Sequence, residues 1–140
     1  MSTREPIIYD QTLDVRFGDL DPYGHLNSSI YLDIVNSSRL IYLERELGVK
    51  TSDLIERGIG FYLTRATQEF LRPVNGFARV RVRSHVANQE AARIRVAFAL
   101  ENPDTEKVYA RGELEFVVMD LKTQRPTPVP EWMEAYFYKS

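Results

Sequence analysis

The sequence predicts an α+β domain in which one curved antiparallel sheet wraps around a single long, apolar helix. Helical periodicity of apolar side chains runs through residues 30–47, and the polar side chains there form only a thin stripe. One segment before this helix and four after it alternate apolar and polar side chains with a period of two. Short turns between the later segments imply antiparallel neighbours. A helix that is apolar on most sides needs cover, which a strongly curved sheet supplies.

The predicted elements follow in chain order. Before Asp19, four apolar side chains share one strand face: Tyr9, Leu13, Val15 and Phe17. Asn27, Ser28 and Ser29 are good N-cap residues, so the helix begins there, and it is expected to be largely buried. Gly48 fits a C-terminal stop.

The second half of the chain predicts four strands. The first covers residues 61–71 and ends at Arg72-Pro73, and the others carry inward-facing apolar residues within 80–86, 92–100 and 110–118. Turns are expected at residues 88–90 and 102–104, and a short helix at 131–137. Such a domain leaves one sheet edge and part of its helix open, so a homodimer or homotetramer is expected.

Composition limits the classes of protein. A length of 140 residues suits one domain, 1–140, and a net charge of -2 disfavours a nucleic-acid partner. The chain has no cysteine, and its first residues have no apolar core of a signal peptide. No segment is apolar enough for a membrane span, so a cytoplasmic protein is expected. Two isolated histidines do not form a metal site.

Residues 16–27 carry the candidate chemistry. This stretch holds two acids, Asp19 and Asp21, one histidine and two glycines, and it lies between a strand and the helix start. A helix N-terminus offers unpaired N–H groups and a positive dipole potential. A carboxylate just before it is therefore placed beside a group that can polarise a carbonyl, which suits nucleophilic or water-activating chemistry.

This stretch resembles a known family. Asp-x-Asp-Pro-x-Gly at residues 19–24, Gly-His-x-Asn at 24–27 and the helix residues Tyr31 and Arg39 are similar to the 4-hydroxybenzoyl-CoA thioesterase family of hot-dog proteins. The segment 69–73 extends the likeness to nearly the whole chain. The resemblance implies a hot-dog fold with a five-stranded sheet around one helix, and hydrolysis of an acyl-CoA or aroyl-CoA thioester. It implies no cofactor, because CoA is part of the substrate.

The resemblance also implies catalytic roles. Asp21 matches the catalytic aspartate, acting as nucleophile or as general base, although a turn aspartate that caps local amides is the alternative. Ser28 matches the residue whose backbone N–H polarises the thioester carbonyl. His25 would orient the carbonyl or assist the leaving thiolate, or it simply packs the loop. Asn27 would position substrate or water, or it serves as the helix N-cap.

Five further residues are expected to contact substrate: Asp19, Gly24, Tyr31, Arg81 and Arg83. Asp19 alternatively braces the turn by accepting a hydrogen bond from Arg16 or Arg39. Gly24 lets the backbone approach a ligand closely, and Tyr31 would help set the pocket length. Arg81 and Arg83 are candidates for the CoA phosphates, or they belong to a solvated sheet face with cross-strand charge pairs.

Two other functions fit the same pattern. An acyl-carrier-protein thioesterase would use the same site with a small acidic protein as partner. A non-catalytic acyl-CoA sensor would keep the fold and the pocket, but it would have no need of Asp21.

Overall fold

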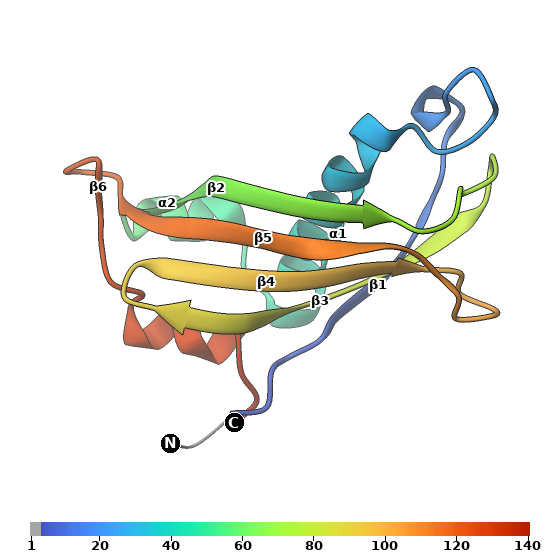
Figure 1. Ribbon diagram of the computed structural model, residues 1–140. Helices are drawn as coiled ribbons and strands as arrows, with labels where there is room; N and C mark the ends of the chain where they lie inside the picture. The colour runs from blue at the N-terminus through green and yellow to red at the C-terminus, as the bar shows by residue number, and fades with distance from the viewer. Residues whose placement is uncertain (1–3) are drawn as a thin grey trace.

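The computed structural model describes residues 4–140. One antiparallel sheet has the strand order β1-β3-β4-β5-β2, and a short strand, β6, pairs with β5. In chain order the strands are β1 (Tyr9–Asp14), β2 (Ile59–Phe70), β3 (Arg79–Glu90), β4 (Arg93–Glu101), β5 (Val108–Asp120) and β6 (Arg125–Pro126). The long helix α1 (Tyr31–Leu47) lies across one face of this sheet, as Figure 1 shows. The predicted hot-dog architecture is thereby confirmed.

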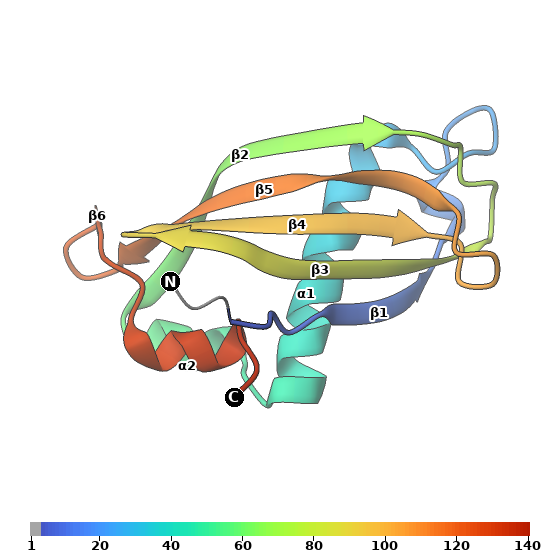
Figure 2. The same cartoon turned by 60° about the horizontal axis from the view of Figure 1, so that its bottom comes forward.

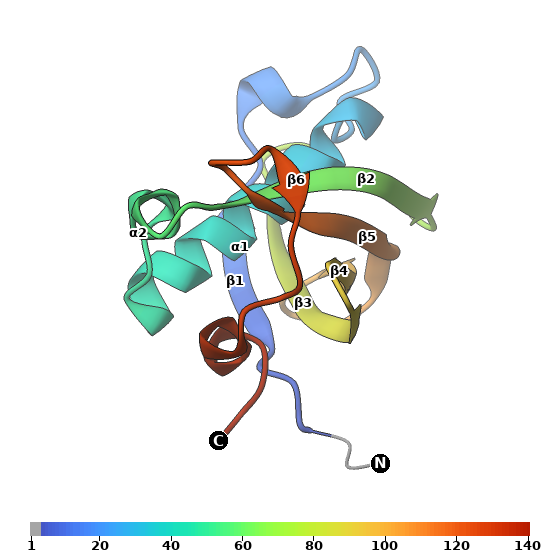
Figure 3. The same cartoon turned by 90° about the vertical axis from the view of Figure 1, so that its left-hand side faces the viewer.

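The core lies between α1 and the concave face of the sheet. Seen from the end in Figure 3, the five long strands form a curved layer with α1 on its inner side. Their inward side chains alternate with outward charged ones, and Val82, Val96 and Leu114 are fully buried. The period-two pattern thus assigned the faces of β3, β4 and β5 correctly.

Helix α1 starts and stops where the cap residues place it. A 3-10 turn, η2 (Ser28–Ile30), precedes it, with Asn27 as N-cap, and Gly48 ends it in the left-handed region at φ 69°. Its buried side chains are Tyr31, Ile34, Val35 and Ser38. The expectation of burial on most sides is wrong within one chain, because the sheet covers only one face of the helix. Leu40, outside the part of the helix that the sheet covers, is 54% exposed.

Three local predictions differ from the structure. Phe17 does not belong to the first strand: it starts the 3-10 helix η1 (Phe17–Asp19), and its side chain is 80% exposed. The β3–β4 reversal lies after Glu90, at Ala91 (φ 52°), so residues 88–90 are strand. A second helix, α2 (Thr51–Glu56), was not predicted, because six residues are too few for a helical period to stand out.

The C-terminal segment closes one end of the concave face. The 3-10 helix η3 (Glu131–Tyr136) lies beside α2 on the same side of the sheet as α1, as Figure 2 shows. Met133 and Phe137 from this segment are buried in the core. The chain ends also pair, because the Ile7 N–H donates to the Phe137 carbonyl at 2.9 Å.

Strand β2 forms one edge of the sheet and contains a bulge. Leu63 pairs with Phe116 and Arg65 with Glu115, which leaves Thr64 without a partner in the ladder. The extra residue shifts the alternation by one. Leu63 therefore faces the concave side before the bulge and Phe70 faces it afterwards, opposite Ala110.

Close contact between β5 and β2 depends on Gly112. A Cβ at this position would lie 1.9 Å from the Thr67 carbonyl oxygen and 2.9 Å from the Phe98 ring. We expect Gly112→Ala to lower the free energy of unfolding by about 1–3 kcal/mol, the usual cost of overpacking. Urea unfolding measures this. The control Gly18→Ala, where a Cβ meets nothing within 4 Å, should change stability by less than about 0.5 kcal/mol. Equal effects of the two substitutions would contradict the assignment.

Candidate active site

The loop of residues 16–27 is held by backbone hydrogen bonds on both sides. Leu20 pairs with Leu26 across the loop, and His25 pairs with Asn75 of the β2–β3 connection. The Leu26 N–H donates to the Val74 carbonyl at 2.8 Å. The loop is therefore anchored to the sheet just before the helix begins.

Asp21 sits at the tip of this loop with one carboxylate oxygen fixed. Its Oδ1 accepts hydrogen bonds from the backbone N–H of Tyr23 at 2.9 Å and of His25 at 3.1 Å. Within residues 4–140, its Oδ2 accepts no hydrogen bond. The capping interpretation and the catalytic interpretation are thus compatible. One oxygen orients the side chain, and the other is free to react.

The helix start offers an unpaired backbone donor beside this loop. Asn27 is the N-cap, as predicted: its Oδ1 accepts from the Ser29 N–H and from the Ser29 hydroxyl, both at 2.9 Å. The Ser28 N–H has no acceptor in the part of the chain that the structure describes. Unpaired N–H groups and the helix dipole both favour a developing negative charge at such a position.

A groove of about 390 Å³ brings several of the predicted residues together. From the predicted set it is lined by Asp21, His25, Asn27, Ser28 and Tyr31. Tyr31 is buried, and its ring meets Phe70 edge-on at 4.9 Å between centroids. Burial, and then the negative charge of Asp21, raise the pKa of the Tyr31 hydroxyl, which therefore stays protonated at neutral pH. The carboxylate of Asp21, the start of α1 and the apolar wall of Tyr31 and Phe70 therefore border the same open groove.

Gly24 stands beside the groove rather than in its wall. Its φ of 77° lies in the left-handed region, so the turn itself needs glycine here. A Cβ would meet nothing within 4 Å. A close approach of the backbone to substrate at Gly24 stays a prediction.

Asp19 is buried beneath the loop and is engaged by Arg16. Its carboxylate accepts from the Arg16 backbone N–H at 2.8 Å and from the guanidinium at 3.2 Å. These hydrogen bonds hold the pKa of Asp19 below its usual value. The side chain does not line the groove. Its geometry agrees with the bracing role, and a contact with substrate stays a prediction.

Arg81 and Arg83 lie on β3, away from the groove lining. Arg81 makes a forked hydrogen bond with Asp10 of β1, with Nε 2.9 Å from Oδ1. Arg83 lies 3.8 Å from a carboxylate oxygen of Glu101 on β4. Both therefore make cross-strand charge pairs on the outer face of the sheet, and phosphate binding by either stays a prediction.

The groove also contains residues that the motif did not indicate. Phe70, Leu71 and Arg72 form its wall at the end of β2. Arg72 is the one arginine or lysine among the described residues that line this groove. The segment 69–73 is part of the family resemblance, which does not show that its side chains reach the groove. Which face of β2 meets the helix start depends on the bulge at Thr64. No local pattern signals that bulge.

Residues 4–140 contain neither a metal-type cluster of side chains nor a membrane-type helix. No cluster of three or more histidine, aspartate or glutamate side chains is placed to hold a metal ion. No helix in that range combines the length and the apolar character needed to cross a membrane.

Comparison with known proteins agrees with the thioesterase family that the sequence resembles. The Thioesterase-like superfamily matches residues 15–137. The chain is 27% identical over 127 residues to the chloroplastic acyl-acyl carrier protein thioesterase ATL2 of Arabidopsis thaliana, covering 89% of this chain. It spans 65% of the length of that relative.

Solved structures share the fold. PA2801, described as a putative thioesterase from Pseudomonas aeruginosa, superposes with a TM-score of 0.78 at 26% identity, covering 90% of this chain and 95% of that one. Slr0204, a 1,4-dihydroxy-2-naphthoyl-CoA thioesterase from Synechocystis, gives 0.82 at 19% identity, covering 92% and 95%. Fold, groove and family match together define a thioesterase-type domain, and the chain belongs to the Thioesterase-like superfamily.

The Arg16–Asp19 pair predicts a pH dependence of stability. Because the folded pKa of Asp19 lies below the unfolded value of about 3.9, the pair stabilises the fold above about pH 4. This contribution is lost as pH falls through the lowered pKa. Urea unfolding at pH 6 and at pH 3 should show a larger loss of stability for wild type than for Asp19→Asn. Asp104→Asn, at an exposed loop position, should keep the wild-type difference. An equal loss in wild type and Asp19→Asn would contradict the assignment.

Proposed function

We propose that the protein hydrolyses acyl-CoA thioesters in the groove at the start of α1. The observation that carries the proposal is the meeting of three groups on one surface. The free carboxylate oxygen of Asp21, the unpaired N–H of Ser28 and the apolar pair Tyr31 and Phe70 all border the groove. These are the parts that acyl transfer from a thioester requires: a nucleophile or base, a donor for the oxyanion and an apolar seat for the acyl group.

Each of these groups has one role in the proposed reaction. The thioester carbonyl oxygen accepts the Ser28 N–H, and the helix dipole stabilises the negative charge that develops on that oxygen. Asp21 either attacks the carbonyl carbon, expelling the thiolate and leaving a mixed anhydride that water cleaves, or removes a proton from the attacking water. In this proposal His25, which also lines the groove, orients the carbonyl or assists the leaving thiolate. Arg72 is the cation available to the polar part of the substrate.

A second substrate class has specific support. The two curated relatives matched, ATL2 and ATL3 of Arabidopsis thaliana, are described as acyl-acyl carrier protein thioesterases, at 27% and 25% identity. An acyl chain on a carrier protein presents the same thioester to the same groove. The sensor alternative is less well supported, because a pure binding site gains nothing from a carboxylate beside a thioester.

Replacement of Asp21 tests the chemistry. The amide oxygen in Asp21→Asn can still accept from Tyr23 and His25, so the loop should keep its shape while losing its anion. We expect thiol release from acyl-CoA to fall by at least about 100-fold, with unchanged unfolding. Asp33→Asn, an exposed acid on α1, and Ser28→Ala, which keeps its N–H, should retain activity within about threefold. Full activity in Asp21→Asn would refute the assignment.

The same assay separates the substrate classes. Release of thiol is followed on short, medium, long and aromatic acyl-CoAs, and in parallel on the matching acyl chains attached to a carrier protein. Faster turnover on the carrier-bound chains would move the proposal to the second class. Absence of turnover on both, with the protein folded, would support the sensor.

We also propose that two copies pair through β2. This edge strand is 12 residues long and exposes Phe61, Tyr62, Leu63 and Phe70. A long, apolar, unpaired edge normally becomes covered. An antiparallel pair of identical edges is self-complementary, as a two-fold interface requires. Since the groove ends at Phe70 and Leu71, a second copy on this edge would also border the groove.

Tyr62→Asp tests this pairing. We expect wild type to have about twice the mass of the 16.3 kDa chain in size-exclusion chromatography with light scattering. A charge on this edge strand should shift Tyr62→Asp toward the monomer. The control Tyr23→Asp replaces a tyrosine that is 84% exposed on the loop and does not belong to β2, and it should keep the wild-type mass. A monomeric wild type would overturn the proposal.

A further inference from the structure

A second cavity lies on the concave side of the sheet, at the opposite end of α1 from the groove. Its volume is about 270 Å³, just below the usual range of small-molecule pockets, about 300–1,000 Å³. The walls come from the middle of α1, from α2, from η3 and from the inner faces of β2, β4 and β5. It shares no lining residue with the Asp21 groove. Most of its lining side chains are apolar, such as Leu43, Phe61 and Phe116.

One permanent charge lies in this apolar wall. Arg39 projects from α1 with its guanidinium carbon 4.7 Å from the centre of the Tyr9 ring. Its Nη1 donates to the buried Ser84 hydroxyl at 3.1 Å. A guanidinium carries five N–H donors, and the structure gives it this single hydrogen bond and no carboxylate partner within residues 4–140.

The missing carboxylate distinguishes Arg39 from two other charges of the domain, each of which has a charged partner. Arg81 pairs with Asp10, and the buried Asp19 pairs with Arg16. Burial lowers the pKa of Arg39, yet a guanidinium remains charged at any physiological pH. Arg39 is partly buried, and a charge partly withdrawn from water without a counter-ion costs free energy that a paired anion would offset.

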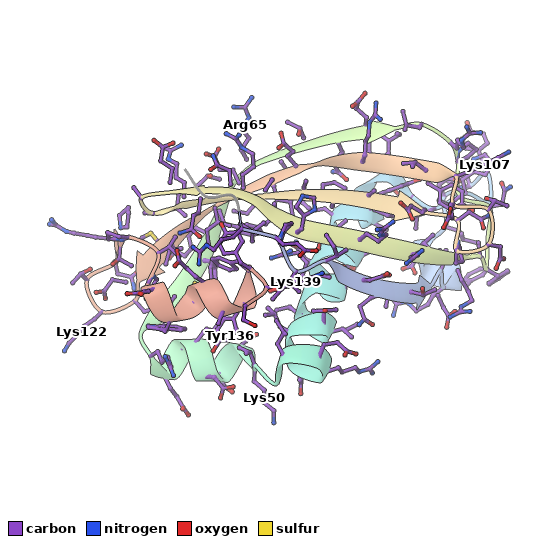
Figure 4. The ribbon with its side chains drawn as sticks, turned by 90° about the horizontal axis from the view of Figure 1, so that it is seen from below. Lys50, Arg65, Lys107, Lys122, Tyr136 and Lys139 are labelled. Carbon is purple, nitrogen blue, oxygen red and sulfur yellow. The ribbon has the colours of Figure 1, made fainter. Side chains whose placement is uncertain are left out.

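A neighbouring amide extends the polar spot. Asn36 lines the same cavity one turn before Arg39, and Leu40 and Leu43 follow on the same helix face. The face therefore offers hydrogen-bond donors at one position and an apolar wall directly after it. Tyr136 completes the lining from η3, which Figure 4 shows beside α2, on the side of the sheet opposite Arg65.

We propose that this cavity binds an apolar carboxylate of short to medium chain length, with its carboxylate on Arg39 and Asn36 and its chain along Leu43 and the sheet. The same chemistry has two sources: a free fatty acid, or the far end of an acyl group that carries a second carboxylate. The first source makes the cavity a separate ligand site. The second makes it the part of the substrate site that selects the acyl chain.

Binding of octanoate to the wild-type protein, measured by calorimetry, tests the shared chemistry without any thioester. We expect octanoate to bind at least about tenfold more tightly than 1-octanol, since a hydrogen-bonded charge is worth about that factor. Arg39→Met, which keeps an apolar side chain of similar length, should abolish this preference. Equal binding of acid and alcohol to wild type, or no binding of either, would overturn the proposal.

A second variant separates lost binding from a lost fold. Leu54→Trp fills the cavity from α2, where the side chain is only partly buried, and leaves Arg39 in place. Octanoate binding should disappear while the unfolding midpoint is maintained. Asp21→Asn, which changes only the other groove, should bind octanoate like wild type. Unchanged binding in the folded Leu54→Trp protein would contradict this location.

Enzyme kinetics then distinguish a free fatty acid from the end of an acyl group as the source of the carboxylate. This test rests on the proposed hydrolase function. If the cavity receives the end of the acyl group, the eight-carbon ω-carboxyacyl-CoA should have a KM about tenfold below that of octanoyl-CoA in wild type but not in Arg39→Met. If the cavity is a separate site, octanoate should bind without that preference and without competing with octanoyl-CoA. A preference for octanoate over 1-octanol that survives in folded Arg39→Met would overturn both versions.

Discussion

The structure depends on one packing constraint: a single sheet must cover a single helix. The inner face of β3, β4 and β5 buries Val82, Val96 and Leu114 against the side of α1 that carries Ile34 and Val35. One curved layer can enclose only part of a cylinder, so the remaining helix face and the β2 edge stay open. The groove at the helix start and the cavity farther along α1 lie where this cover is incomplete within residues 4–140. Both candidate binding sites therefore exist because one sheet cannot cover the whole surface of the helix.

The proposed catalytic groups owe their positions to the backbone more than to side-chain packing. Asp21 is oriented by two N–H groups of its own loop, and that loop is tied to the β2–β3 connection through Leu26 and His25. Asn27 caps the start of the helix by accepting from the Ser29 N–H. The Ser28 N–H is left without an acceptor among the described residues. A site built in this way is formed before substrate arrives, and little reorganisation is needed when charge develops.

Most of the fold could be predicted from local patterns, and the reasons are physical. Alternation determined which valines of β3 and β4 face inward, and cap residues located both ends of α1. Features that depend on distant partners were not predictable. The exposure of Phe17 reflects where the chain leaves β1, and the reversal at Ala91 reflects pairing between β3 and β4. The motif identified Asp21 and Ser28, but Phe70 and Arg72 enter the groove only through the register of β2.

That register depends on Thr64, whose hydroxyl donates to the Glu115 carbonyl at the bulge. Before it, Phe61 and Leu63 face the cavity; after it, Phe70 faces Tyr31 in the groove. One unpaired residue thus lets a single strand supply apolar walls to two separate sites. Deleting Thr64 would turn Phe70 to the outer face of the sheet, although the identity of every residue that lines the groove would stay the same. For related chains, the number of residues in β2 is therefore as informative about ligand selection as the identity of those residues.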